Sequence, residues 1–451
     1  MNNLWIAFAV SLVVLVGSFV LFEKDIMAPS VVFSAVFSIS IAAALYNYDV
    51  WNVSYEWNSL SLILLAIVQF ALVNYVVYQF FKRRSVRYSK ESVSIQFTLA
   101  PVVSTLFALG AIIGIVLYVK NVLAIAGNGA ESTQIGYLIN RYHQIVLGEV
   151  KVSQSMPFLV NQLVKLIQAC AYVASFSIVV RFVTSQRRWW ALMDVVTVLC
   201  FVVFALFSSS RMLLMELLAA SVTYAYLIYQ HNSKWQIKAT WRIIVGILGV
   251  FVLFLVAFYY ATFAIGRNTG NTMLYYIAYY AGGSIPLFQL FVTTPLTHPG
   301  VFGYETFFNL NQFLVKMKVL SIENYSRHLE FRGLEPGVYF GNVYTGLRRY
   351  LSDFGMIGMM ILELIFSLFF TVFYYSIRYD HSKRFSALKI LLYGYCVSAL
   401  FLHSVDDTLF SSILSVNGLS KLFLIAVVYG LFSSEWLKTK MHKMRMILLK
   451  R

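Results

Sequence analysis

Long, uninterrupted apolar runs are the feature that most constrains the fold of this chain. A membrane-spanning helix needs about 20 predominantly apolar residues. Eleven runs approach that length, at about 4–22, 30–46, 60–81, 97–119, 157–180, 190–207, 212–230, 241–264, 354–377, 386–403 and 418–436. Because the runs are continuous and do not alternate every second residue, they predict helices and not the strands of a barrel. We therefore expect an all-α polytopic membrane protein with about eleven (11–12) transmembrane helices, forming one membrane domain over residues 1–451.

The amino-acid composition agrees with this class and excludes a water-soluble chain. Only 12% of the residues are charged and 60% are hydrophobic, whereas soluble domains have about 25% charged residues. The three cysteines lie inside apolar runs and form no CxxC pair, so neither a disulfide framework nor a thiolate metal site is predicted. The first run lacks a basic leader and a small-residue cleavage site, and we interpret it as a retained span.

Lysine and arginine residues cluster between the apolar runs, and their positions predict the orientation of the chain. Five segments hold at least three basic residues each, at 82–90, 181–188, 234–242, 378–389 and 438–451. With eleven spans all five fall on one side, which the positive-inside rule makes cytoplasmic. The N-terminus then lies outside, the C-terminus lies inside, and 120–156 and 265–353 are outer loops. The net charge of +16 thus reflects membrane topology, and no nucleic-acid partner is expected.

The outer loop 265–353, between the eighth and ninth predicted spans, is the largest polar segment of the chain. Its stretch 272–292 is interrupted by two glycines and a proline, so we expect short interfacial or re-entrant helices there. The loop also holds Arg267 and Arg332, with aromatic residues between its charges. Long loops cross membranes largely regardless of charge, so an ordinary solvated cap is the alternative interpretation of each arginine.

Arg348 and Arg349 precede the ninth run in the stretch GNVYTGLRRYLSDFGMIG, residues 341–358. If the helix begins near 342–344, both arginines lie in its first turns, where the helix dipole disfavours each cation by about 0.3–1 kcal/mol. Two guanidinium groups at a helix N-terminus favour a bound diphosphate. Anchoring at the membrane interface by snorkelling side chains is the alternative.

Ionisable residues at or below the outer ends of other spans are further candidates. Arg211 begins the seventh span after three serines. His403 and Asp407 lie at the outer end of the tenth span, where a histidine beside carboxylates is either a general base or part of a capped helix end. We interpret Lys165 and Glu363 as a structural ion pair in preference to catalytic groups.

The stretch 341–358 and the span after it resemble the motif of the oligosaccharide repeat unit polymerases, the Wzy-type O-antigen and capsule polymerases. In that family an Asn-x-Tyr-Thr stretch precedes Asp-Phe-Gly and a further glycine, matched here by Asn342, Tyr344, Thr345, Asp353, Phe354, Gly355 and Gly358. SSSR at 208–211 resembles a Gly/Ser-Arg pattern of the family, and DD-T-LF at 406–410 falls where the family has a short polar motif. The Arg-x10-Gly repeats of some O-antigen polymerases are missing, so their two-loop scheme is not transferred.

The resemblance implies a glycosyltransferase of the bacterial inner membrane that uses no nucleotide sugar, cofactor or metal. It would move a growing glycan from undecaprenyl diphosphate onto the non-reducing end of a new lipid-linked repeat unit. Its partners would be this lipid-linked oligosaccharide, membrane lipid and, by family, a flippase and a chain-length regulator. The hypothesis assigns the diphosphate to guanidinium groups and the acceptor hydroxyl to a carboxylate or histidine. Candidate catalytic residues are Arg348, Arg349, Asp353, His403 and Asp407; candidate substrate-binding residues are Arg211, Arg267, Arg332, Asn342, Tyr344 and Thr345.

Two other functions fit the same predicted topology. A ligase that transfers finished glycan would share the outer arginines, but its loss would leave full-length lipid-linked polymer instead of single repeats. A flippase or other transporter usually shows internal repeats and shorter outer loops, neither of which is visible here.

Overall fold

A computed structural model describes most of the chain and is helical almost throughout. The described residues are 2–85, 95, 97, 99–185, 191–236, 245–246, 249, 252, 255–256, 259–260, 262–263, 272–295, 300–322, 325, 329–334, 338–379 and 386–432. Within them, two short paired strands are the only sheet. The prediction of an all-α membrane protein is confirmed at this level.

Seven of the described helices are long and apolar enough to cross a membrane. They are α1 (Asn2–Leu21), α2 (Pro29–Tyr46), α4 (Trp57–Ser85), α5 (Pro101–Gly127), α7 (Phe158–Val183), α9 (Arg211–Asn232) and α14 (Gly346–Arg378). Shorter apolar helices form at three further predicted runs: α8 (Ala191–Phe207), α15 (Ser386–Cys396) with α16 (Ser398–Leu402), and α17 (Val416–Phe432). The predicted run 241–264 lies largely outside the described residues, so the count of eleven stays a prediction.

The outward faces of the helices are as apolar as their interior, as a bilayer environment requires. Val13 on α1 and Ile357 on α14 are 72% and 74% exposed. Inside, α4 packs along α14, and α1 packs against both α2 and α4. A second, smaller core joins α5, α7 and α8 to the short helix α6 (Ile135–Leu147).

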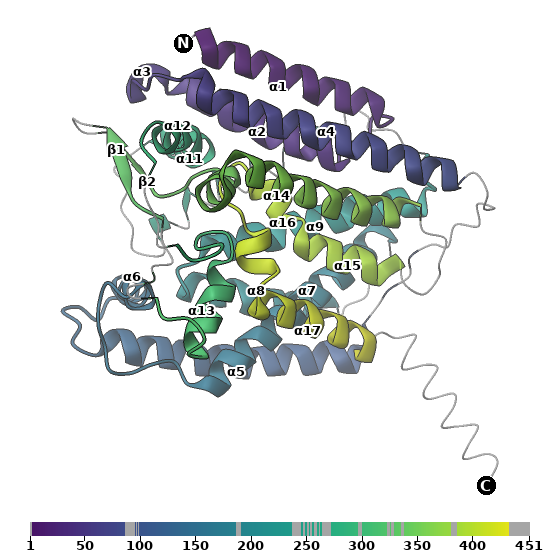
Figure 1. Cartoon of the computed structure of the whole chain (residues 1–451). Coiled ribbons are helices and arrows are strands. Elements are labelled where there is room, and N and C mark those ends of the chain that lie inside the picture. Colours follow the sequence, from purple (N-terminus) through teal and green to yellow (C-terminus); the bar gives the residue numbers. More distant parts are fainter. Residues whose placement is uncertain are drawn as a thin grey trace.

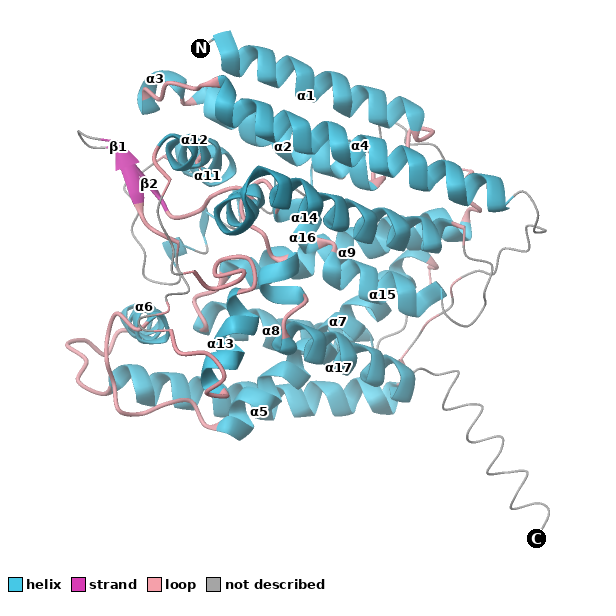
Figure 2. Cartoon of the chain, viewed as in Figure 1, coloured by secondary structure: helices cyan, strands magenta, loops and turns pink. Residues whose placement is uncertain are grey.

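Short elements gather at one end of the helix bundle (Figures 1 and 2). They are α3 (Tyr48–Trp51), α6, α11 (Met273–Gly282), α12 (Ser284–Thr293), α13 (Phe308–Lys316) and the antiparallel strands β1 (Arg332–Leu334) and β2 (Val338–Gly341). Both predicted outer loops thus contribute to the same end. The stretch predicted as interfacial or re-entrant forms α11 and α12, which have ten residues each and meet at Gly283.

An ion-pair cluster holds the opposite end of the bundle together, where α14 ends. Arg378, in the last turn of α14, donates to Asp25 at 3.1 Å and to Glu23 at 2.6 Å, both in the turn between α1 and α2. Lys82 in the last turn of α4 also pairs with Glu23, at 2.9 Å. Burial opposes ionisation of Glu23, but hydrogen bonds from Lys82 and Tyr78 and the charge of Arg378 outweigh it and lower the pKa of Glu23 to about 2.

The helix α14 is interrupted near its N-terminal end by Gly355, with φ 65° and ψ −171°. This conformation is essentially restricted to glycine. It separates a short segment, residues 346–354, from the long span at 356–378. Gly355, the glycine of the Asp-Phe-Gly stretch, therefore allows the segment that carries Arg348 and Arg349 to run in a different direction from the long span.

Candidate functional site

The helix α14 begins at Gly346, a few residues later than the sequence predicted, with Thr345 as its N-cap residue. The Gly346 amide donates to the carbonyl of His403 at 2.8 Å, so a distant segment satisfies one of the free N–H groups of the helix start. A Cβ on Gly346 would lie 2.7 Å from Cε1 of His403. Glycine at this position therefore allows the 403–409 segment to pack directly on the helix start.

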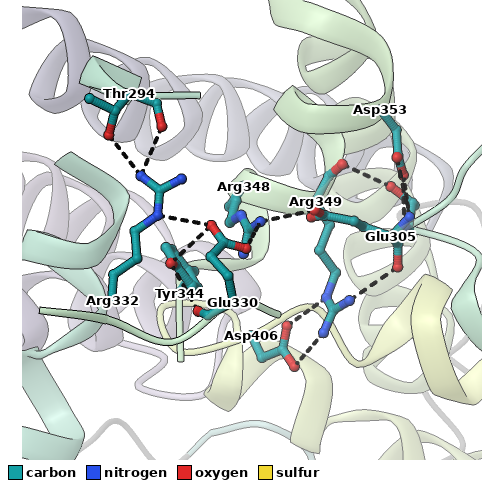
Figure 3. A network of polar contacts seen from close by, with 10 residues as sticks. Thr294, Glu305, Glu330, Arg332, Tyr344, Arg348, Arg349, Asp353 and Asp406 are labelled. Atoms are coloured by element: carbon teal, nitrogen blue, oxygen red, sulfur yellow. Dashed lines mark hydrogen bonds and ion pairs between the residues drawn. The ribbon is translucent and has the colours of Figure 1, made fainter. Parts of the chain in front are cut away.

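Arg348, the third residue of α14, is completely buried. Its guanidinium lies 4.1 Å from the ring centroid of Tyr344 and 4.7 Å from that of Phe291. Its Nη2 donates to Glu305 at 2.9 Å and to Glu330 at 2.5 Å, as Figure 3 shows. Among the described residues, no acceptor lies within hydrogen-bond distance of its Nε and Nη1. These two nitrogens of Arg348 thus carry three N–H groups without an acceptor, and an unmade hydrogen bond of a buried group costs about 1–3 kcal/mol.

Arg349 is held by a carboxylate on the 403–409 segment. Its Nε and Nη2 donate to the two oxygens of Asp406 at 2.7 and 3.0 Å, a bidentate pair, and its Nη1 donates to the Glu305 carbonyl at 3.1 Å. One turn on, Asp353 accepts from the backbone amides of Glu305 and Thr306, the latter at 2.7 Å. Together these contacts fix the 305–306 segment on the N-terminal end of α14.

Arg332 and Tyr344 complete the network (Figure 3). Arg332 pairs with Glu330 at 3.1 Å, and its Nη1 donates to the carbonyl and hydroxyl of Thr294, both at 2.8 Å. The Tyr344 hydroxyl donates to the same carboxylate oxygen of Glu330, Oε1, at 3.1 Å, while Arg348 binds Oε2. Burial, followed by the charge of Glu330, raises the pKa of Tyr344 above its usual range. Glu330 is therefore the point where the strand β1, the loop before α14 and Arg348 meet.

Asp407, a predicted general-base candidate, has the geometry of a capped turn. Its carboxylate accepts from the amides of Leu409, Phe410 and Ser411, the start of the π-helical turn η1 (Leu409–Ile413), and from the hydroxyl of Tyr350 at 2.9 Å. Burial raises the pKa of Asp407, while the neighbouring His403 opposes the shift. Of the two interpretations of this segment, a general base or a capped helix end, the contacts of Asp407 match the capped helix end.

His403 and Glu363 form a fully buried pair, with Nε2 and Oε2 3.1 Å apart. The rings of Phe33 and Phe366 enclose the imidazole, with centroids at 5.4 and 4.2 Å. The expected pairing of Glu363 with Lys165 is wrong, because the segment after α16 folds back under Gly346 and brings His403 to Glu363 instead. Sequence spacing could not show this, since the two partners are 40 residues apart.

Arg211 lies in a second group of predicted residues, as the first residue of α9. Its guanidinium donates to the hydroxyls of Thr262, Tyr276 and Tyr280, at 3.1 Å for Thr262 and 2.9 Å for Tyr280. Tyr280 also lines a cavity of about 360 Å³, and Asn342 is another of its lining residues. Arg211 thus lies next to this cavity, and Asn342 forms part of its wall.

The predicted site residues therefore fall into two groups. Arg332, Tyr344, Arg348, Arg349, Asp353, His403 and Asp407 gather around the start of α14; Arg211 and Asn342 lie at the cavity. Thr345 is the N-cap residue of α14, and its buried Oγ1 has no hydrogen-bond partner among the residues that the structure describes. Arg267 lies outside the described residues. Of the carboxylates that pair with the arginines, Glu305 and Glu330 were not predicted, and their only sequence signal was their acidity in the loop before a basic helix start. Asp406 belongs to the DD-T-LF stretch of the resemblance, but its pairing with Arg349 was not predicted.

The fold and the site define a polytopic helical membrane protein with a buried guanidinium–carboxylate network at the end formed by its two long loops. Within the described ranges, no three His, Cys, Asp or Glu side chains are grouped to hold a metal ion. Comparison with known protein families, curated proteins and solved structures finds no match to the chain.

Proposed function

We propose that the protein polymerises undecaprenyl-diphosphate-linked oligosaccharide repeat units into a surface polysaccharide at the outer face of the bacterial inner membrane. The reaction transfers the growing glycan to the non-reducing end of a new repeat unit. The proposal joins the sequence resemblance at 341–358 to the surroundings of Arg348.

The observation that supports it most is the incomplete hydrogen bonding of Arg348. A purely structural buried arginine is expected to use all of its donors, because each unmade bond is costly. Within the described part of the chain, the Nε and Nη1 of Arg348 have no acceptor and the neighbouring Thr345 Oγ1 has no partner, at the positive end of α14. Phosphate oxygens satisfy such donors well, and the helix dipole favours them.

Glu330 explains how a diphosphate can bind at an arginine that already has a carboxylate partner. Its side chain is 22% exposed, whereas that of Glu305 is 3% exposed. In the proposal the diphosphate takes the place of Glu330 on Arg348, while Glu305 stays. Removing one anion and adding another keeps the buried guanidinium paired throughout, which avoids the large cost of an isolated buried charge.

The chemical step exchanges one glycosidic bond for another. The acceptor hydroxyl oxygen attacks C1 of the reducing-end sugar of the growing glycan, the bond from C1 to the diphosphate oxygen breaks, and the diphosphate leaves with the electron pair. Arg348 stabilises the charge that develops on this leaving group. The hydroxyl proton goes to a base. Asp353 and Asp407 hold backbone amides and His403 is enclosed by rings, so each would need this end of the bundle to rearrange.

The test is a gel of lipid-linked glycans from a strain that lacks the gene, complemented with variants of the chain. The deletion strain should accumulate single repeat units, and the native chain should restore the polymer ladder. Arg348→Lys keeps a charge for Glu305 but loses the Nε and Nη1 donors, and should leave single repeats at normal protein levels.

Arg378→Lys is the matched control, because Arg378 is also buried and ion-paired but lies at the opposite end of the bundle. It should restore the ladder. Full-length lipid-linked polymer in the deletion strain would indicate a ligase instead. A normal ladder from Arg348→Lys would contradict the role of Arg348.

A further inference from the structure

The cavity beside Arg211 lies where the two long loops of the protein meet. Its walls come from α6 in the first loop and, in the second loop, from α11, the start of α12, Phe331 and the residues that end β2. At about 360 Å³ it falls within the range of small-molecule sites, about 300–1,000 Å³. One of its walls depends on glycine: Gly341 has φ +80°, and a Cβ there would lie 3.1 Å from the Tyr279 hydroxyl.

The chemistry of the lining matches a sugar ring. Tyr279, Phe331 and Phe340 contribute aromatic side chains to the lining, and Phe331 is 55% exposed, so that the C–H face of a pyranose can stack on its ring. Asn140, Gln144 and Asn342 offer amide groups, each of which both donates and accepts hydrogen bonds, as ring hydroxyls do.

The same lining is unsuited to a phosphate. Among the described residues that form the cavity there is no lysine or arginine; His143 is the one basic side chain there, and Glu149 contributes a carboxylate from the same wall-forming loop. A carboxylate repels an anion in a partly enclosed site. An uncharged sugar, including one with an N-acetylamino group, therefore fits the cavity better than a diphosphate or an acidic sugar does.

The cavity is also placed next to both groups of predicted site residues. Tyr280 forms part of its wall and accepts a hydrogen bond from Arg211 at 2.9 Å. Asn342 and Val343, which also line the cavity, directly precede Tyr344 in the chain, and the ring of Tyr344 covers Arg348 at 4.1 Å. A sugar in the cavity would therefore touch Tyr280, the partner of Arg211, and the residues that lead into Tyr344.

We infer that this cavity is a subsite for one uncharged sugar residue, a neutral hexose or an N-acetylhexosamine, of the lipid-linked glycan. The inference rests on the proposed function. It separates the two recognition tasks, because the sugar binds between the loops and the diphosphate binds at the start of α14. It also gives α6, which the sequence hypothesis left without a role, a part in substrate selection.

Binding of simple glycosides to the full-length chain in lipid nanodiscs tests the inference. The probes are methyl glycosides of neutral hexoses and N-acetylhexosamines, and their binding is measured by saturation-transfer NMR. Methyl glucuronide and inorganic pyrophosphate are the charged comparisons. The test variant combines Asn140→Ala with Gln144→Ala, and Gln134→Ala, an exposed residue on the same loop, is the control.

At least one uncharged glycoside should give a signal that falls at least fivefold in the double variant and is unchanged in the control. Three results would overturn the inference: no uncharged glycoside binds, the signal is equal in both variants, or pyrophosphate or the glucuronide displaces the bound glycoside. Failure of the proposed function looks different. In that case the deletion strain makes normal polymer, whatever the glycosides do.

Discussion

Replacing Gly355 with alanine tests the kink that aims the arginine-bearing segment of α14. At φ 65° and ψ −171° an alanine costs about 1–3 kcal/mol, the usual cost of a sparsely populated backbone conformation. Apart from the chain neighbours and the backbone of the same helix, no described atom lies within 4 Å of the added Cβ, so overlap with other elements adds nothing to this value. We expect Gly355→Ala to lower the free energy of unfolding by about 1–3 kcal/mol, or roughly a 5- to 150-fold change in the unfolding equilibrium constant.

Gly110→Ala makes the same chemical change in an ordinary helical position of α5, where the added Cβ also meets no atom within 4 Å. There alanine should raise the stability by about 0.5–1 kcal/mol, because glycine is the poorer helix former. Both variants can be followed by tryptophan fluorescence in mixed micelles with increasing dodecyl sulfate. The reasoning would be refuted if the two substitutions shifted the unfolding midpoint in the same direction, or if Gly355→Ala left it unchanged.

Three further predictions concern the contacts around the two ends of α14. Arg349→Met should lower the free energy of unfolding by about 3 kcal/mol. This is the lower end of the range for breaking a buried ion pair, because Asp406 is one-third exposed. An unfolding midpoint equal to that of the native chain in the micelle titration would contradict this prediction. Gly346→Ala should lower the free energy of unfolding by about 1–3 kcal/mol, because the added Cβ overpacks against His403. An unfolding midpoint as high as that of Gly110→Ala would count against this contact. Because the pKa of Glu23 is lowered to about 2, its ion pairs stabilise the fold above pH 4–5 and are lost as the pH falls toward 2, an effect reduced by solvent screening; Glu23→Gln should flatten this part of a stability–pH curve, and an unchanged slope would argue against it.

The helices could be predicted from the sequence, since a bilayer imposes both the length and the apolar character of each span. The break between α11 and α12 was also visible, because Gly282, Gly283 and Pro286 interrupt an otherwise apolar stretch. The kink at Gly355 was not, since a glycine in an apolar run is compatible with a continuous helix. Residues 346–354 are held by contacts from outside the helix, such as those of Gly346 with His403 and of Asp353 with Thr306, which local sequence does not show.

The candidate site was predictable only in part, for a related reason. The position of Arg348 and Arg349 in the first turn follows from local sequence alone. Their carboxylate partners lie 18 to 57 residues away in the sequence. No periodicity relates an acid at 305, 330 or 406 to the arginines at 348 and 349. The sequence therefore indicated where two cations lie, but left open whether a ligand or the protein itself supplies their counter-charge.

The ion pair between Asp25 and Arg378 also has a consequence for how the chain is made. The two residues are 353 positions apart. At a synthesis rate of about 5–20 residues per second, Arg378 emerges from the ribosome roughly 20–70 s after Asp25. For that interval the first helical hairpin has to remain in the membrane with its acidic turn held only by earlier partners, among them Lys82 on α4 and Tyr226 on α9. The ion pairs of Arg378 at this end of the bundle thus form only after α14, the ninth predicted span, has been synthesised. The packing of α14 is therefore a late assembly step during biosynthesis.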